Sequence, residues 1–339
     1  MSVANAGPAL RVATWTAPAN IAFVKYWGSH DPDAGLPLNP SLSMTLSHCT
    51  AACTVRRSPV ASVRVFRADG HDGVAPAPAA LADPVAAHVR RVMHRAGQDG
   101  GADVAVAVDF PVAAGLASSA AIFAAVTRAA ADAFGLDLDS VGLADLARSA
   151  GSGSAARSMA GGYVEWTLHA GRSALDVVAP ASHWDLRDVI AVVDAAPKRV
   201  SSREGHRRAL TSPYFQRRLT LVDDRLARTR DAILRRDVAA LGIVAEEEAL
   251  DLHLIAMSAR PPFRYWRAAT LAILDEVEAM RREGVSAWST MDAGPNVHVL
   301  CEPHAEDEVA RRLTALGGTR RIIRDRVGQG PAPSVRHLL

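Results

Sequence analysis

The fold is decided by the stretch Phe110-Pro-Val-Ala-Ala-Gly-Leu-Ala-Ser-Ser-Ala-Ala121, which joins two segments of different periodicity. Before it, residues 102–109 alternate and are rich in valine, which predicts a strand. After it, an Ala-rich segment continues without Gly or Pro as far as Gly135, which predicts a helix. The small residues between them, ending in Ser118 and Ser119, are therefore expected to form a turn at the start of a helix.

This turn is suited to binding phosphate. A helix N-terminus offers free N–H groups and partial positive charge, and small residues let the backbone approach a ligand closely. An ordinary strand–turn–helix with a serine N-cap explains the same residues equally well. No Gly-Lys-Ser/Thr is present, so the turn is not a Walker loop. The spacing alone leaves both interpretations open.

The composition indicates a globular protein with two domains. The chain has 339 residues, of which 49% are hydrophobic and 22% charged, and this length and apolar content suit two domains with full cores. A net charge of +2 gives no strong field toward nucleic acid or membranes. No apolar run approaches the length of a membrane span. We therefore expect neither nucleic acid nor a membrane as a partner.

The cysteines and the first residues indicate the compartment. Cys49, Cys53 and Cys301 show no metal-ligand spacing, and an odd number argues against a disulfide framework. Residues 1–10 lack a basic segment followed by an apolar core, so no signal peptide is expected. These features predict a reducing, cytoplasmic environment.

Lysine is rare in this chain, and both lysines stand out. Lys25 follows the short apolar segment 21–24 and precedes two aromatic residues. It either extends along the edge of the core to solvent or points into a site. Lys198 stands in the polar, basic segment 194–206, for which a solvated interdomain loop is the simpler interpretation.

Residues 151–157 read Gly-Ser-Gly-Ser-Ala-Ala-Arg. The glycines predict a turn after a helix that ends near Ser149, followed by a short helix that carries Arg157. Backbone amides from the turn and a guanidinium one turn further on suit an anion. A flexible surface loop with a solvated arginine explains the pattern as well, and spacing alone does not exclude it.

The other periodicities predict the mixture of strands and helices that is typical of an α+β fold. Strands are expected at 41–46, 51–55, 60–66, 163–168, 174–178, 189–193 and 320–323. Helices are expected at 84–96, 211–257, 268–283 and 304–316, with a hairpin turn at 69–73 and a Pro/Ala linker at 74–82. Asp292 stands in a tight turn between two strands within 286–300, as a turn former or as a catalytic carboxylate.

Together these stretches resemble the mevalonate diphosphate decarboxylases of the GHMP kinase superfamily. The resemblance runs from about Ala17 to Leu300. Its carriers are Ala17-Pro-Ala-Asn-Ile-Ala22, Lys25-Tyr-Trp-Gly28, residues 111–121 and 151–166, Val200-Ser-Ser-Arg203 and Met291-Asp-Ala-Gly-Pro-Asn296. Their occurrence in the family's order makes the resemblance specific and favours the functional interpretations. It implies an α+β, two-domain GHMP kinase fold, with an ATP-binding ribosomal-S5-like domain at 1–190 and a ferredoxin-like domain at 191–339.

The resemblance also implies the chemistry. ATP, with Mg²⁺, would phosphorylate the tertiary hydroxyl of a phosphorylated mevalonate, and the new phosphate would leave as carbon dioxide is lost. Asp292 corresponds to the family's catalytic aspartate, which orients or deprotonates the hydroxyl. Lys25 corresponds to the lysine that supports this carboxylate and the transferring phosphoryl group. Arg157 corresponds to the arginine that binds the substrate carboxylate.

The remaining site residues that the resemblance implies fall into two sets. The substrate-binding set is Asn20, Tyr26, Ser152, Gly153, Ser154, Ser202 and Arg203. The ATP phosphates are expected at Ala114, Gly115, Leu116, Ala117, Ser118 and Ser119, and the hydroxyl of Ser118 or Ser119 is the candidate magnesium ligand. Because relatives are often dimers, the resemblance also predicts a homodimer.

One departure from the family bears on the substrate. Gly28 is followed by Ser29, where many bacterial relatives have a lysine that helps to hold the diphosphate. Loss of a charge-assisted contact weakens binding by roughly 1.5–3 kcal/mol, so we expect mevalonate 5-phosphate as the substrate and isopentenyl phosphate as the product. If Arg199 or His30 replaces that lysine, the substrate is the 5-diphosphate.

Two other classes of protein are alternatives to a decarboxylase. A mevalonate kinase that does not decarboxylate shares the fold, but such relatives lack the combined Asp, Lys and Arg set that is present here. A non-catalytic metabolite-binding protein would be expected to have lost Asp292 or the loop serines. The sequence therefore favours a decarboxylase.

Overall fold

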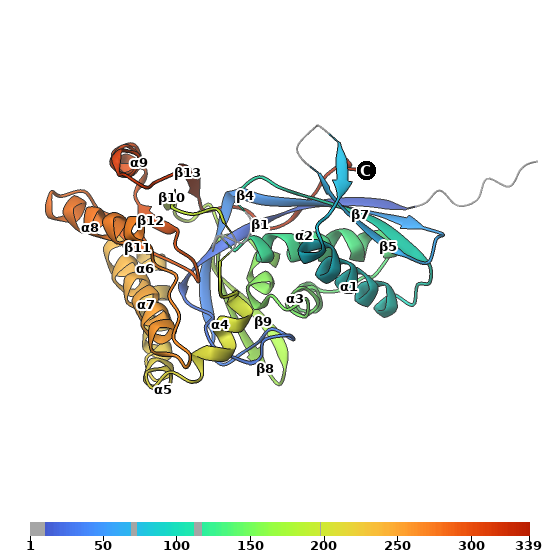
Figure 1. The fold of residues 1–339 in the computed structure, drawn as a ribbon, viewed down its shortest axis with the longest axis horizontal. Coiled ribbons are helices and arrows are strands. Elements are labelled where there is room, and N and C mark those ends of the chain that lie inside the picture. Colours follow the sequence, from blue (N-terminus) through green and yellow to red (C-terminus); the bar gives the residue numbers. More distant parts are fainter. Residues whose placement is uncertain (1–10, 69–72, 112–116, 197) are drawn as a thin grey trace, which may run out of the picture.

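The chain folds into two lobes, and the long strands β1 and β4 extend from one toward the other (Figure 1). The computed structural model describes residues 11–68, 73–111, 117–196 and 198–339. Sheets and helices occur in both lobes. This confirms the expected α+β class.

The N-terminal lobe is an eight-stranded sheet whose helices pack on one face (Figure 1). The strand order is β14-β1-β4-β7-β5-β6, and β8 pairs with β4 and with β9. The strands are β1 (Val12–Val24), β4 (Ser41–Ser58), β5 (Val63–Ala68), β6 (Val74–Pro76), β7 (Gly101–Val108), β8 (Tyr163–His169), β9 (Arg172–Ala179) and β14 (Ala332–Pro333). The helices are α1 (Ala79–Arg95), α2 (Ser118–Phe134), α3 (Ser140–Arg148) and the 3₁₀ helix η1 (Gly153–Met159), and a two-stranded ribbon is formed by β2 (Ser29–Asp31) and β3 (Leu36–Pro37).

The C-terminal lobe is a four-stranded antiparallel sheet with helices packed against it (Figure 1). Its strands, in spatial order, are β11 (Ala287–Thr290), β12 (Val297–Cys301), β10 (Arg187–Val192) and β13 (Arg321–Arg326). Its helices are α4 (Ser202–Ala209), α5 (Phe215–Leu219), α6 (Val222–Arg235), α7 (Val238–Ser258), α8 (Ala268–Arg282), α9 (Glu306–Ala315) and the 3₁₀ helix η2 (Pro303–Ala305). Because β10 belongs to this sheet, the expected boundary after residue 190 falls inside a strand.

The predicted strand–turn–helix is confirmed as β7 and α2. Almost every residue of α2 is buried, because its alanines let the helix pack closely on the sheet. The helix ends at Gly135, whose left-handed backbone (φ 67°) suits a residue without a side chain. Helix α2 packs mainly against β1 and β4, in the middle of the sheet.

Three local expectations are wrong. Residues 41–58 form one strand, β4, instead of two, because Asp325 of β13 accepts hydrogen bonds from the backbone N–H groups of residues 47–49 at 2.8–2.9 Å and supports the polar middle. The expected linker at 74–82 contains β6 and the first turn of α1, since its alanines favour helix. The expected helix 211–257 is divided, because Arg236 has a positive φ and Asp237 caps α7.

The three cysteines contribute no disulfide to this fold. Within the described part of the chain, no helix has the length and apolar character needed to cross a membrane. Cys49, Cys53 and Cys301 are all buried and free. Burial raises the pKa of each thiol, so all three are poor nucleophiles. The predicted hairpin turn at 69–73 lies largely outside the described residues.

Candidate active site

Lys25 and Asp292 form an ion pair where the two lobes meet. Lys25 directly follows β1, and Asp292 lies in the turn after β11. The Lys25 Nζ donates to Asp292 Oδ1 at 3.0 Å and to the Ala22 carbonyl at 2.6 Å. The lysine side chain is 1% exposed and the aspartate side chain 25%. The carboxylate can therefore meet a ligand while the lysine supports it from the protein side.

The electrostatics favour an ionised pair. Burial lowers the pKa of Lys25, and the nearby Asp292 opposes that shift. Burial acts to raise the pKa of Asp292, but the positive charge of Lys25, with His298 and Arg157, outweighs it and lowers this pKa. Asp292 is therefore a carboxylate at neutral pH and can accept a hydrogen bond or a proton from a hydroxyl.

Arg157 lies on η1 beside this pair and is 2% exposed. Its guanidinium donates to Ser43 Oγ at 2.9 Å, to Ser41 Oγ at 2.5 Å and to Asn20 Oδ1 at 3.0 Å. Burial lowers the pKa of Arg157 to about 10, so it remains charged at neutral pH. The three bonds use three of the five N–H groups of an arginine, which leaves donors for an anionic ligand.

Asn20 orients this arginine from β1. Its Nδ2 donates to the Ser158 hydroxyl at 2.7 Å and to the Ser154 carbonyl at 3.1 Å, while its Oδ1 accepts from Arg157. Both amide donors are thus engaged within the protein. The geometry makes Asn20 a support for η1 and Arg157, and its predicted contact with substrate stays a prediction.

The N-terminus of α2 meets the Gly-Ser turn. Ala117, the N-cap of α2, has a left-handed backbone (φ 50°). This conformation is uncommon for a residue with a side chain, and the residues that adopt it are found most often at functional sites. Ser118 is buried and Ser119 is exposed. The Ser152 hydroxyl donates to the Ser119 hydroxyl at 3.2 Å. Ala114, Gly115 and Leu116, expected at the ATP phosphates, lie outside the described residues.

Gly153 and Tyr26 are in close contact. A Cβ atom on Gly153 would lie 2.5 Å from Tyr26 Cε1 and 3.1 Å from the Trp166 ring, so a side chain does not fit there. The Tyr26 ring also lies 4.2 Å from the ring of His206, measured between centroids. The half-buried Tyr26 therefore separates η1 from α4, as a wall of the site.

Lys198 is a site residue that the sequence interpretation missed. The expected solvated loop is wrong at this position, because the Lys198 Nζ donates to Ser202 Oγ at 2.7 Å and to the Ala293 carbonyl at 2.5 Å. Burial lowers the pKa of Lys198 to about 8, against the opposing effect of Asp292. The signal that could have found it was the scarcity of lysine, since both lysines of the chain converge on the Asp292 turn.

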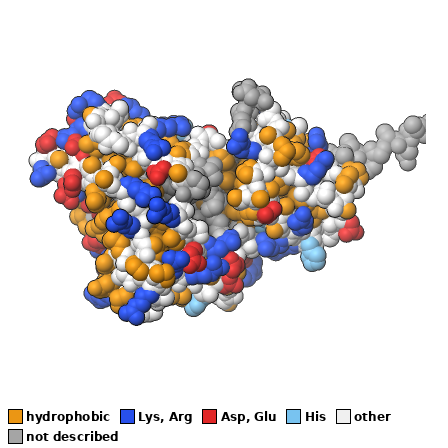
Figure 2. All heavy atoms as spheres, viewed as in Figure 1, with side chains coloured by type: hydrophobic (Ala, Val, Ile, Leu, Met, Phe, Trp, Pro, Cys, Tyr) orange, Lys and Arg blue, Asp and Glu red, His pale blue; other side chains and the backbone are white. Residues whose placement is uncertain are grey.

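Two further segments of the candidate site lie around Ser29 and Arg203. Ser29 is buried, and its hydroxyl donates to the Leu36 carbonyl within the β2–β3 ribbon. Arg203 is exposed on α4, with its Nε 3.5 Å from Asp33 Oδ1. Lys and Arg side chains are numerous beside the notch between the lobes (Figure 2). Positive charge for a phosphorylated ligand is thus available from α4 and the segment before it.

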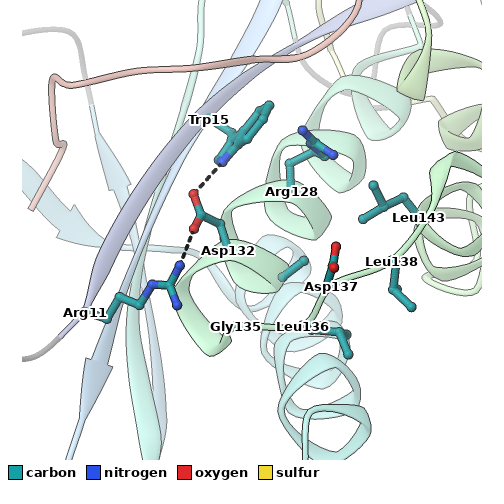
Figure 3. Close-up of a pocket in the computed structure, with 10 residues that line it drawn as sticks. Arg11, Trp15, Arg128, Asp132, Gly135, Leu136, Asp137, Leu138 and Leu143 are labelled. Atoms are coloured by element: carbon teal, nitrogen blue, oxygen red, sulfur yellow. Dashed lines mark hydrogen bonds and ion pairs between the residues drawn. The ribbon is translucent and has the colours of Figure 1, made fainter.

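A separate cavity of about 370 Å³ lies elsewhere (Figure 3). Asp132 in it bridges Arg11 and the Trp15 indole at 3.0 and 3.2 Å, and the Arg128 guanidinium lies 3.8 Å from the centroid of the Trp15 ring. This cavity adjoins the C-terminal end of α2, roughly 25 Å from the serines at its N-terminus by helix geometry. Arg11, Asp132 and Arg128 are thus engaged with one another or with Trp15, and the cavity is not part of the site.

The residues fit magnesium carried by a nucleotide better than a metal site made of protein alone. Across the described ranges, no cluster of three or more His, Cys, Asp or Glu side chains could hold a metal ion. Magnesium commonly binds through one carboxylate or hydroxyl together with substrate phosphates. Asp292 and the serines of α2 offer such ligands, so this donor set fits Mg²⁺ only in the company of a phosphate ligand.

Comparisons with known proteins identify the family of this chain. The family model of the diphosphomevalonate decarboxylase-like N-terminal domain matches residues 17–179, and that of the mevalonate 5-diphosphate decarboxylase C-terminal domain matches residues 188–332. Diphosphomevalonate decarboxylase mvd1 of Aspergillus fumigatus is 35% identical over 90% of this chain and 80% of its own length. The human diphosphomevalonate decarboxylase is 32% identical over 91% of this chain and 80% of its own length.

Solved structures lead to the same family. The mevalonate diphosphate decarboxylase of Enterococcus faecalis has a TM-score of 0.86 at 31% identity, covering 96% of this chain and 99% of that one. A complex of MDDEF with MVAPP, AMPPCP and magnesium has a TM-score of 0.87 at 31% identity, with the same coverage. These relatives are named for the diphosphate, so the comparisons favour the 5-diphosphate alternative over our expectation of a monophosphate. The chain belongs to the diphosphomevalonate decarboxylase family of ATP-dependent decarboxylases.

Proposed function

We propose that this protein converts mevalonate 5-diphosphate and ATP into isopentenyl diphosphate, ADP, phosphate and carbon dioxide, as a step of isoprenoid biosynthesis. The observation that carries the proposal is the Lys25–Asp292 ion pair beside the buried Arg157. The family and the substrate named for its relatives support the choice of the diphosphate. Ser29 occupies the position at which many bacterial relatives have a lysine. This difference does not exclude the diphosphate as substrate, because Lys198 and Arg203 supply positive charge nearby.

In the first half of the reaction, the Asp292 carboxylate accepts the proton of the tertiary hydroxyl at C3. The oxygen then forms a bond to the γ-phosphorus of ATP, and the bond to ADP breaks. Lys25 holds Asp292 in place and offers positive charge to the transferring group. Magnesium bound with ATP would neutralise part of the phosphate charge. The N-terminus of α2, with Ser118 and Ser119, is the proposed binding segment for the nucleotide phosphates.

In the second half, the C3–O bond breaks and phosphate leaves with the electron pair. The C1–C2 bond then breaks, carbon dioxide departs, and its electron pair forms the C2=C3 double bond. Arg157 binds the carboxylate and orients it for this loss. Tyr26, Gly153, Ser154 and Ser202 are the proposed walls and contacts of the substrate pocket.

A coupled ATP assay with mevalonate, its 5-phosphate and its 5-diphosphate side by side tests this function. The expected result is the highest kcat/KM with the diphosphate, together with one carbon dioxide per ADP. ADP formation without carbon dioxide would instead indicate a mevalonate kinase. A higher kcat/KM with the monophosphate would reject the proposed substrate.

We also propose a homodimer. The α7 helix exposes Ile243, Leu250, Leu254 and Met257 at 41–51% of their surface, which is an apolar row that a second copy could cover. A monomer mass by light scattering at micromolar concentration would reject this. The cytoplasmic location stays a prediction.

A further inference from the structure

Lys25 stands where the backbone hydrogen bonding of β1 ends. Val24 is the last residue of that strand, paired with Leu42 of β4. The N–H and C=O of Lys25 therefore lie beyond the sheet ladder, in a buried position where unpaired backbone groups are costly. Side chains of the C-terminal lobe and of Asn39 form hydrogen bonds with both of these groups.

Three side chains hold the Lys25 backbone. Its N–H donates to Glu248 Oε2 at 2.7 Å. Its carbonyl accepts from Arg218 Nη2 at 2.7 Å and from Asn39 Nδ2 at 3.0 Å. Arg218 also donates to Glu248 Oε2 at 2.6 Å and to Asn39 Oδ1 at 3.2 Å. The three side chains thus form a closed ring of bonds around the backbone N–H and C=O of a single residue.

The ring is fully buried and charged. The side chains of Arg218 and Glu248 are 1% and 0% exposed. Burial acts to raise the pKa of Glu248, but Arg218 and Arg225 outweigh it and lower this pKa. Bonds between ionised groups are shorter and stronger than neutral ones, so the ring fixes the Lys25 main chain more firmly than a turn would.

The fixed main chain bears on the position of Lys25 Nζ. From this fixed main chain the side chain reaches Asp292 at 3.0 Å. Glu248 and Asp292 belong to the same lobe, whereas Lys25 belongs to the other. We propose that Arg218 and Glu248 are positioning residues for Lys25, which set its amine against Asp292 for phosphoryl transfer. This proposal rests on the proposed function for its kinetic consequence, but its geometric part can be measured without turnover.

Arg225 provides a matched control within the same network. It donates to Glu248 Oε1 at 2.5 Å and to Asp251 at 2.7 Å, and its side chain is 7% exposed. Arg225 also forms an ion pair with Glu247 at 3.6 Å. These three partners are all carboxylates, whereas Arg218 also bonds the Lys25 carbonyl. Arg218→Met and Arg225→Met each remove one buried arginine from Glu248, and the first also removes a bond to the Lys25 backbone.

The kinetic test compares these two variants with the 5-diphosphate substrate, well below both melting temperatures. Arg218→Met is expected to lower kcat at least tenfold with KM changed less than threefold. Arg225→Met is expected to lower the melting temperature comparably but to leave kcat within threefold of the wild type. Arg218→Lys should recover part of kcat, because an ammonium can still reach at least one of the three acceptors of Arg218. Equal kcat losses in the two methionine variants would overturn the proposal.

The second measurement needs no turnover and separates this proposal from the proposed function. The chain has only two lysines, so protein labelled with ¹³C at lysine Cε gives two signals, which Lys198→Met assigns. The Lys25 signal should move in Arg218→Met and Glu248→Gln and stay in place in Arg225→Met. An unchanged signal in the first two variants overturns the proposal, even if the enzyme is active. If Arg218→Met does not fold, Arg218→Lys and Glu248→Gln serve for both measurements.

Discussion

The hydroxyl of Ser152 donates to the hydroxyl of Ser119 at 3.2 Å. Ser119 is in the first turn of α2, and Ser152 precedes η1, which carries Arg157. The contact joins the segment expected to hold nucleotide phosphates to the segment expected to hold the substrate. Two loops that are 33 residues apart in sequence therefore present one polar surface.

The first prediction concerns this contact. Ser119→Ala and Ser152→Ala should each raise the KM for ATP and for the 5-diphosphate, because either change alters both loops. In a double-mutant cycle on kcat/KM, the coupling should be about 0.5–1.5 kcal/mol, the size of one hydrogen bond. Strictly additive effects would mean that the two serines act independently.

The second prediction concerns the carboxylate. Asp292→Asn keeps the shape of the side chain but cannot accept a proton, so kcat should fall by roughly 10²–10⁴, the usual contribution of a general base. Binding of the 5-diphosphate, measured by calorimetry, should change far less. A variant that retains more than a tenth of the wild-type kcat would exclude Asp292 as the base.

The third prediction concerns pH and Lys198. Its amine loses its proton near pH 8 because burial lowers the pKa to about 8, so the KM for the 5-diphosphate should rise as the pH passes 8. In the unfolded chain the Lys198 amine keeps its proton up to about pH 10.5, whereas in the folded protein it loses the proton near pH 8. Because the unfolded chain binds the extra proton in this range, folding becomes more favourable as the pH rises from about 8 to 10.5. Both effects should disappear in Lys198→Met. A KM that is flat from pH 7 to 9 in the wild type would contradict the assignment.

The fourth prediction concerns the Gly153–Tyr26 contact. Gly153→Ala places a methyl group 2.5 Å from the Tyr26 ring, which must shift, and overpacking of this kind costs about 1–3 kcal/mol. The melting temperature should fall and the KM for the 5-diphosphate should rise. Gly317→Ala is the control, because no atom lies within 4 Å of its added Cβ. Equal effects of the two substitutions would show that the contact has no special role.

Local patterns in the sequence predicted the elements around the site, and distant contacts decided the rest. The β7–turn–α2 unit follows from periodicities within some thirty residues, so it was predictable. The partners of Arg157 were not, because Ser41 and Ser43 are more than 110 positions away. The same applies to Lys198, whose neighbours in sequence are polar but whose amine is held by Ala293, 95 residues further on. The resemblance supplied the residues of the site, and the structure supplied the supports that no short pattern encodes.

Strand β14 has a practical consequence for handling the protein. Pro333 and Ala332 pair with Trp15 and Thr16 of β1, and His337 lies 2.7 Å from the Thr14 hydroxyl. A truncation before residue 332 would uncover a row of unpaired N–H and C=O groups on β1, which is a template for self-association. Purification tags are therefore better attached to the N-terminus, and shortened versions should be checked for aggregates before any kinetic defect is assigned to the active site.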